Sequence, residues 1–163
     1  MATALQNLSH YNPDTVPVGE SYRFAVIVAE WNSEVTMALM WGAINTLQKH
    51  GVPADQIRTE FVPGTFELTL GAQLASERSD IDAVIVLGCV IQGETRHFDF
   101  ICQGVTYGIT EVNLKYNKPV IFGVLTTDNQ EQALDRAGGK HGNKGDEAAI
   151  TALKMLALKN KMK

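Results

Sequence analysis

The chain has 163 residues and a mass of 17.8 kDa, a length that fits one domain with a substantial buried core. Fourteen Lys and Arg residues against eighteen Asp and Glu residues give a formal net charge of −4, which argues against nucleic acid or an anionic membrane as the main partner. Apolar residues make up 45% of the sequence, and this share excludes a disordered chain.

The sequence also predicts a cytoplasmic protein with no membrane segment. The longest apolar run, residues 83–91, is far shorter than the roughly 20 residues of a membrane helix. Arg23 is the first basic residue, so the N-terminus lacks the charged start of a secretory signal. Cys89 and Cys102 have neither metal-type spacing nor the density of a disulfide scaffold.

Residues 1–20 are predicted to form an N-terminal arm. They hold Pro13, Pro17 and Gly19 and show no apolar periodicity. We expect this arm to be ordered against a neighbouring copy, where it could add a strand. No repeat or linker divides residues 21–163, which we expect to form a single domain.

Beyond the arm, apolar runs typical of buried strands alternate with helical periods. The predicted strands cover residues 23–29, 57–62, 83–90 and 119–125. The predicted helices cover residues 33–50, 66–77, 98–112, 129–137 and a last segment around 149–157. This alternation favours a three-layer α/β/α sandwich with a four-stranded parallel sheet. Ligands bind outside the carboxyl ends of such strands, so the corners that follow the strands are the places to search.

The first two corners offer polar and aromatic groups. Trp31 follows the first strand and either caps the core or provides a flat surface for a planar ligand, while Asn32 offers an amide. The second corner reads Pro63-Gly64-Thr65-Phe66-Glu67, with a glycine that permits close backbone approach. Glu67 is either a ligand contact or a carboxylate that the helix dipole favours.

The third corner, residues 88–99, is the most informative. Gly93 and Thr95 fall at the predicted start of a helix, where free N–H groups bind anions. His97 could move protons beside a bound phosphate, and the alternative is a histidine on a helix surface. Cys89 has apolar flanks and no neighbouring base, so we interpret it as a packing residue.

Motifs for common cofactors are missing from the sequence. The glycine-rich residues 137–145 lack the order of a P-loop and do not follow a predicted strand. No G-x-G-x-x-G follows a strand, and no H-E-x-x-H or close Cys/His cluster suggests a metal. We therefore expect neither a cofactor nor a metal.

These motifs together resemble the 6,7-dimethyl-8-ribityllumazine synthase family over about residues 20–160. The similarity rests on five ordered segments: Trp31-Asn32, residues 63–68, residues 88–98, residues 119–127 and residues 136–145. The resemblance implies condensation of 5-amino-6-(D-ribitylamino)uracil with 3,4-dihydroxy-2-butanone 4-phosphate, the penultimate step of riboflavin biosynthesis, without metal or organic cofactor.

The resemblance also implies roles for particular residues. His97 would be the proton-transfer residue, Trp31 would stack on the pyrimidine, and Phe122 would come from the adjacent chain. The residues implied to hold the aminouracil and its ribityl chain are Trp31, Asn32, Thr65, Phe66, Glu67, Cys89, Val90, Ile91, Phe122 and Lys144. Those implied to hold the phosphate are Glu94, Thr95 and Arg136.

Members of the family assemble into pentamers, and some form a sixty-chain shell. The compact segment 138–145 favours the shell here, and association with riboflavin synthase is a further expectation. Two other functions fit the fold: a non-catalytic flavin- or lumazine-binding protein, and a flavodoxin-like redox protein. His97 and Arg136 favour the enzyme over the non-catalytic binding protein. A flavodoxin-like redox protein would need a Ser/Thr-rich phosphate loop directly after the first strand, and the sequence has none there.

Overall fold

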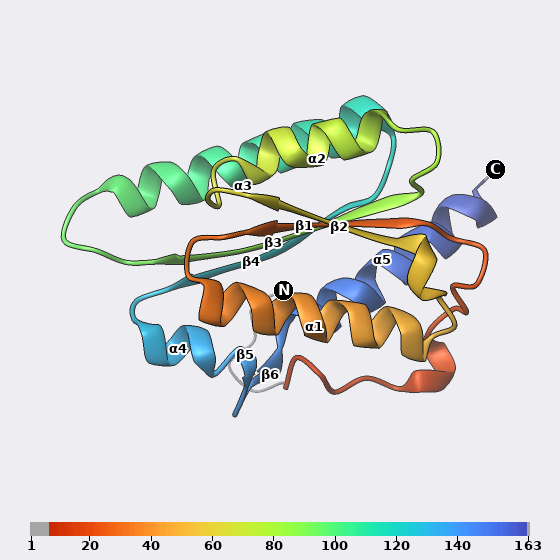
Figure 1. Ribbon diagram of the computed structural model, residues 1–163, viewed down its shortest axis with the longest axis horizontal. Coiled ribbons are helices and arrows are strands. Elements are labelled where there is room, and N and C mark those ends of the chain that lie inside the picture. The colour runs from red at the N-terminus through yellow and green to blue at the C-terminus, as the bar shows by residue number, and fades with distance from the viewer. Residues whose placement is uncertain (1–6, 163) are drawn as a thin grey trace.

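The computed structural model describes residues 7–162 and places a four-stranded parallel sheet between two layers of helices (Figure 1). The strands are β1 (Phe24–Ala29), β2 (Ile57–Val62), β3 (Ala83–Ile91) and β4 (Val120–Thr127), in the order β2-β1-β3-β4. The α-helices are α1 (Ser33–Lys49), α2 (Leu68–Glu77), α3 (His97–Tyr116), α4 (Gln130–Leu134) and α5 (Lys144–Lys161). The predicted α/β/α sandwich is confirmed.

The core has two halves, one on each face of the sheet. All six residues of β1 are buried because helices cover both of its faces. Even-numbered residues of β1 pack towards α1 and α5, and odd-numbered residues pack towards α2 and α3. None of the helices within residues 7–162 is long and apolar enough to cross a membrane.

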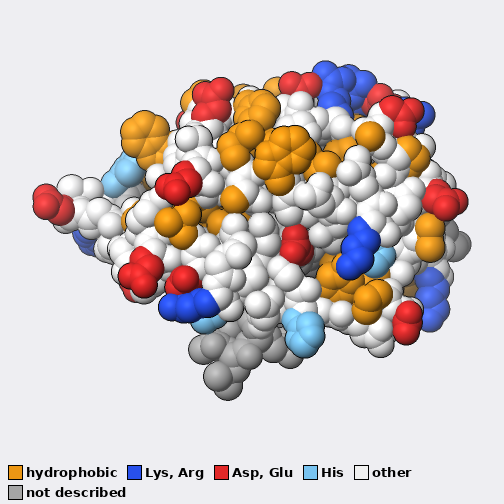
Figure 2. Space-filling view, turned by 60° about the horizontal axis from the view of Figure 1, so that its bottom comes forward, with side chains coloured by type: hydrophobic (Ala, Val, Ile, Leu, Met, Phe, Trp, Pro, Cys, Tyr) orange, Lys and Arg blue, Asp and Glu red, His pale blue; other side chains and the backbone are white. Residues whose placement is uncertain are grey.

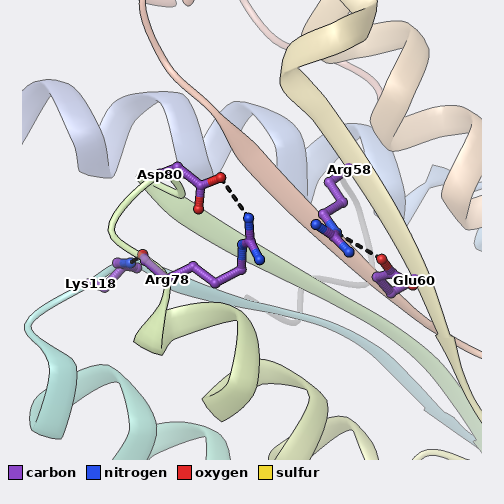
Figure 3. A network of polar contacts seen from close by, with 5 residues as sticks. All are labelled: Arg58, Glu60, Arg78, Asp80 and Lys118. Atoms are coloured by element: carbon purple, nitrogen blue, oxygen red, sulfur yellow. Dashed lines mark hydrogen bonds and ion pairs between the residues drawn. The ribbon is translucent and has the colours of Figure 1, made fainter.

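Charged side chains gather on the edge strand β2 and on the segment that follows α2. Figure 3 shows two ion pairs there, Arg58–Glu60 and Arg78–Asp80, each with an N···O distance of 2.7 Å. Their side chains are about half exposed, so water screens these pairs and they contribute little stability. Lys118 has a structural role instead, because its Nζ donates to two carbonyl oxygens at the end of α2, at 2.7 and 2.8 Å. Burial lowers the pKa of this ammonium group.

Residues 7–20 of the predicted arm pack on their own chain and include the short 3₁₀-helix Pro13–Thr15. The Leu8 N–H donates to the His141 carbonyl oxygen at 2.7 Å, and the Tyr11 hydroxyl lies 3.1 Å from His50 Nε2. This part of the arm therefore makes contacts within its own chain. Strand addition to a neighbouring chain stays a prediction, and residues 1–6 lie outside the described residues.

The glycine-rich segment differs from the sequence prediction, which gave it no regular structure. It forms an antiparallel pair, β5 (Ala137–Gly139) with β6 (Gly142–Asn143), and α5 begins directly afterwards at Lys144. Asn143 caps this helix, since its Oδ1 accepts from the Gly145 N–H at 2.8 Å. Its Nδ2 donates to the Ala38 carbonyl oxygen of α1 at 2.9 Å. Asn143 therefore joins α5 to α1.

We expect Asn143→Ala to lower the free energy of unfolding by about 2 kcal/mol, because it removes a helix cap and leaves a carbonyl group without its side-chain partner. Asn143→Ser can still cap α5 but cannot reach Ala38, so it should cost about half as much. Urea denaturation at one fixed protein concentration measures both changes. A value for Asn143→Ala within about 0.5 kcal/mol of the parent protein would contradict this role.

Candidate functional site

The carboxyl ends of all four strands meet at one edge of the sheet. The last pair of β1 and β2 is Ala29 with Val62, and the last pair of β3 and β4 is Ile91 with Thr127. Parallel pairing therefore brings together the corners that follow β1, β2 and β3, although these strands end at Ala29, Val62 and Ile91 and lie far apart in the sequence. The candidate site lies at this edge.

Trp31 extends from the first corner into solvent. Its side chain is 74% exposed, so it does not cap the core of its own chain. Its backbone is held in place, because the Trp31 N–H donates to the Pro63 carbonyl oxygen at 3.1 Å. This bond fixes the first corner against the second and leaves the indole ring available for a planar ligand.

Asn32 links the first corner to the third. Its backbone is left-handed, with φ 63° and ψ 45°, and its Nδ2 donates to the Cys89 carbonyl oxygen at 2.8 Å. The buried Thr65 hydroxyl lies 3.5 Å from the same oxygen. Gly88 permits this approach, since a Cβ there would lie 2.8 Å from both Thr65 Oγ1 and the Leu68 side chain. Three corners thus converge on one carbonyl group.

Phe66 and Glu67 complete the second corner on the α2–α3 side. Phe66 is 54% exposed, and its ring lies over Gly104 of α3. Helix α2 begins at Leu68, two residues later than predicted, so Glu67 occupies the N-cap position and its carboxylate is exposed. Sequence reasoning did not single out Gly104 or Gly88 as residues beneath the site, although a glycine inside a buried strand often marks close packing.

The loop after β3 corrects one sequence prediction. Helix α3 begins at His97, so Gly93, Glu94 and Thr95 precede the helix instead of forming its first turn. The Thr95 hydroxyl accepts from the His97 N–H at 3.4 Å, a weak cap. Glu94, Thr95 and His97 are all exposed, and they lie together at the entrance to α3.

The geometry supports a packing role for the Cys89 side chain. Burial raises the pKa of its thiol to about 11, which keeps it protonated at neutral pH. A nucleophilic cysteine needs the opposite shift. Only the backbone of Cys89 is therefore available to a ligand.

Three predicted site residues lie apart from this group. Phe122 is half-buried on the edge strand β4, five residues before its end, which places it about 17 Å along the strand from the corners at roughly 3.3 Å per residue. Arg136 donates to the Gln132 carbonyl oxygen at 2.9 Å, and Lys144 pairs with Glu147 at 2.8 Å. Within residues 7–162, the structure gives none of the three a polar contact with the strand-end group.

Cavities also occur away from the strand-end corners. Two cavities, of about 430 and 460 Å³, lie near the amino-terminal ends of the strands and are lined by residues such as Lys118 and Asp55, and a third, of about 400 Å³, lies between β2 and α2 beside Leu74. Across the described part of the chain, no three His, Cys, Asp or Glu side chains gather as a metal site requires. The fold and the corners define a parallel α/β protein with a candidate small-molecule site at its strand ends.

Comparison with known proteins gives the family. A sequence model of 6,7-dimethyl-8-ribityllumazine synthase matches residues 21–160. A 6,7-dimethyl-8-ribityllumazine synthase from Cytophaga hutchinsonii is 66% identical, over 96% of this chain and 98% of its own length. Proteins of the same name from Porphyromonas gingivalis and Parabacteroides distasonis are 58% and 57% identical, over 97% and 96% of this chain and 98% of their own lengths. The chain belongs to the 6,7-dimethyl-8-ribityllumazine synthase family.

We expect iodoacetamide at about pH 8 to modify Cys89 roughly 100-fold more slowly in the folded protein than in urea, because a pKa near 11 leaves little thiolate. Because the thiol pKa is higher in the folded protein, it adds to the free energy of unfolding at any pH below 9.0, the value in the unfolded chain. This contribution is lost as the pH rises from 9.0 towards 11. In Cys89→Ala, the free energy of unfolding should no longer show this decrease between pH 9 and 11, and turnover should stay within about twofold of the parent value. Fast labelling of Cys89 in the folded protein, or an inactive but folded Cys89→Ala variant, would contradict the packing role.

Proposed function

We propose that this protein condenses 5-amino-6-(D-ribitylamino)uracil with 3,4-dihydroxy-2-butanone 4-phosphate, giving 6,7-dimethyl-8-ribityllumazine, phosphate and water. Its place in the lumazine synthase family, with 66% identity over nearly the whole chain, is the observation that carries this proposal. The reaction is the penultimate step of riboflavin biosynthesis. A cytoplasmic location and association with riboflavin synthase stay predictions.

The aminouracil lies in the corners after β1, β2 and β3. Trp31 stacks on the pyrimidine, and its exposed ring supports this role. Backbone groups of residues 65–67 and 89–91 hold the uracil and the ribityl chain, and the Glu67 carboxylate accepts from ribityl hydroxyl groups. The backbone N–H groups of Glu94 and Thr95 hold the phosphate of the second substrate, and Arg136 adds a charge-assisted contact.

The chemistry requires proton movement at each step and no covalent attachment to the protein. The amine of the uracil attacks the ketone carbon, and loss of water gives an imine. A proton is then removed next to the imine, and elimination breaks the C–O bond so that phosphate leaves. The resulting enol tautomerises, and the ribitylamino nitrogen closes the ring with loss of a second water. His97 carries these protons, and the binding of two small reactants side by side supplies much of the rate.

The site is completed by a second copy of the chain. Phe122 lies on an edge strand and far from the strand ends of its own chain, so it closes the pocket of a neighbour. Lys144 also completes the pocket. In a pentamer, each chain makes this contact with its neighbour around the ring. A sixty-chain shell would contain the same contact within each of its pentamers.

Exposed apolar side chains support such an assembly, because large apolar patches of this kind mark interaction surfaces. Figure 2 shows apolar side chains reaching the surface in several groups on one face of the molecule. On α2 and α3 the exposed apolar residues recur at helical spacing: Leu70, Leu74, Phe100, Tyr107 and Leu114.

The direct test is to mix the purified protein with both substrates and to follow the fluorescence of the lumazine product. Product formation above the uncatalysed rate supports the enzyme. Binding of lumazine or riboflavin without turnover would instead identify the non-catalytic carrier, which the synthase names of the relatives do not favour.

We expect His97→Ala to lower turnover roughly 10- to 100-fold without loss of folding, because a positioned proton-transfer group contributes about 10²–10⁴-fold and the attacking amine is already nucleophilic at neutral pH. His10→Ala is the matched control, since His10 is exposed on the arm and outside the strand-end group. Steady-state kinetics with both substrates measure the effect. Full activity of His97→Ala would show that His97 is only a helix-surface histidine.

We expect Trp31→Arg and Phe122→Arg each to abolish activity and to complement one another when they are unfolded together and co-assembled in equal amounts. If Trp31 and Phe122 come from adjacent chains, roughly a quarter of the contacts then pair an intact Trp31 with an intact Phe122. Activity should return to about that fraction of the parent value. Mixed rings that native mass spectrometry confirms but that remain inactive would place both residues in one chain's site.

A further inference from the structure

Asn32 occupies a helix cap position but does not use its side chain as a cap. Asparagine at this position usually accepts a hydrogen bond from an N–H group in the first turn of the helix. In this protein the Asn32 side chain makes no such bond to α1. Its backbone instead takes the left-handed conformation, which Asn tolerates better than most residues, and its amide points across the site.

The Cys89 carbonyl group lies in the part of β3 that extends beyond its pairing with β1. The Val84 and Gln92 N–H groups both donate to the β4 side, to Pro119 and Thr127 carbonyl oxygens at 2.8 Å. Backbone groups alternate along a strand, so the N–H and C=O groups of Cys89 and Ile91 face the β1 side. The pairing of β1 with β3 ends at Val28 and Leu87, so no residue of β1 pairs with Cys89 or Ile91 on that side.

Asn32 takes the place of the missing strand. Its Nδ2 donates to the Cys89 carbonyl oxygen at 2.8 Å, although the two residues are 57 positions apart in the sequence. Thr65 adds only a long contact of 3.5 Å to the same oxygen. A buried carbonyl group at a strand end needs a partner, and Asn32 provides the short bond. Beyond it, the Ile91 N–H group faces the same side.

We propose that Asn32 is a positioning residue, which holds the Cys89 carbonyl group so that residues 89–91 present the Ile91 N–H on the β1 side of the sheet, where the corner with Trp31 follows its strand. This inference rests on the proposed function, because it assumes that the aminouracil binds between these groups. One N–H of the Asn32 amide is engaged by Cys89, and in this inference the effect of Asn32 on the reaction passes through that bond. Loss of the bond should therefore affect the aminouracil and leave the phosphate substrate unaffected.

Two substitutions separate the side chain from the backbone. Asn32→Gly keeps the left-handed conformation and removes the bond to Cys89. Asn32→Asp keeps the size and the backbone preference but places an acceptor against the Cys89 carbonyl oxygen. Asn117→Gly is the matched control, because Asn117 is the other non-glycine residue with positive φ among residues 7–162 and follows α3, away from the strand ends.

We expect both Asn32 variants to raise the KM for the aminouracil about tenfold, the effect of about one hydrogen bond, and to leave the KM for the phosphate substrate unchanged. Hydrogen exchange of the amides at residues 89–91, measured without ligand, should accelerate in both variants. The control should change neither quantity. Lumazine binding, read from quenching of tryptophan fluorescence, should weaken by a similar factor.

Two outcomes would overturn the inference. If the KM for the aminouracil rises while exchange at residues 89–91 stays at the parent rate, Asn32 contacts the substrate directly. If exchange accelerates without any change in KM, the bond to Cys89 is structural only. A parent protein that makes no lumazine would count against the proposed function instead, and the exchange experiment on Asn32→Gly would still test the bond itself.

Discussion

The parallel pairing of β1 with both of its neighbours is the constraint on which the rest of this structure depends. Phe24 pairs with Ile57 on one side and with Ala83 on the other, so one strand sets the register of three. A slip of one residue would turn every side chain of β1 to the opposite face, so that residues that pack towards α1 and α5 would meet α2 and α3 instead. The same register determines which carbonyl groups of β3 have no partner on β1. The Cys89 carbonyl group is one of them, and Asn32 donates to it.

Much of the fold could be predicted because its strong signals are local. The apolar run of β3 and the periodicity of α1 extend over enough residues for the pattern to identify the element. The pair β5–β6 has too few residues for any period, and its glycines suggested an irregular loop. Gly93 and Thr95 were expected at the start of a helix, but both precede α3, because the loop after β3 continues to Arg96 and the Thr95 hydroxyl makes only a weak cap at His97.

The candidate site was predictable in its parts but not in its connections. Motifs place Trp31, Thr65 and His97 at corners, since each follows a strand that the sequence identifies. The bond from Asn32 to Cys89 depends on a positive φ and on where the pairing of β1 ends, and neither leaves a sequence signal. The separation of Phe122 from the corners likewise follows from its place along β4. Trp31 and Phe66 keep large rings in water, and only a ligand or a second chain can remove that apolar surface from solvent.

The hydrogen bonds of the N-terminal arm to residues near the C-terminus determine when the arm can fold during synthesis. Ser9 accepts a hydrogen bond from the Asn143 N–H, across 134 residues, and Leu8 donates to His141. The ribosome synthesises the N-terminal residues first. The arm can therefore form these hydrogen bonds only after residues 141–143 have been synthesised, when nearly the whole chain is complete. The central strands can pair earlier, because β3 is complete long before residue 141 is added. The first segment to be synthesised is thus among the last to reach its final position.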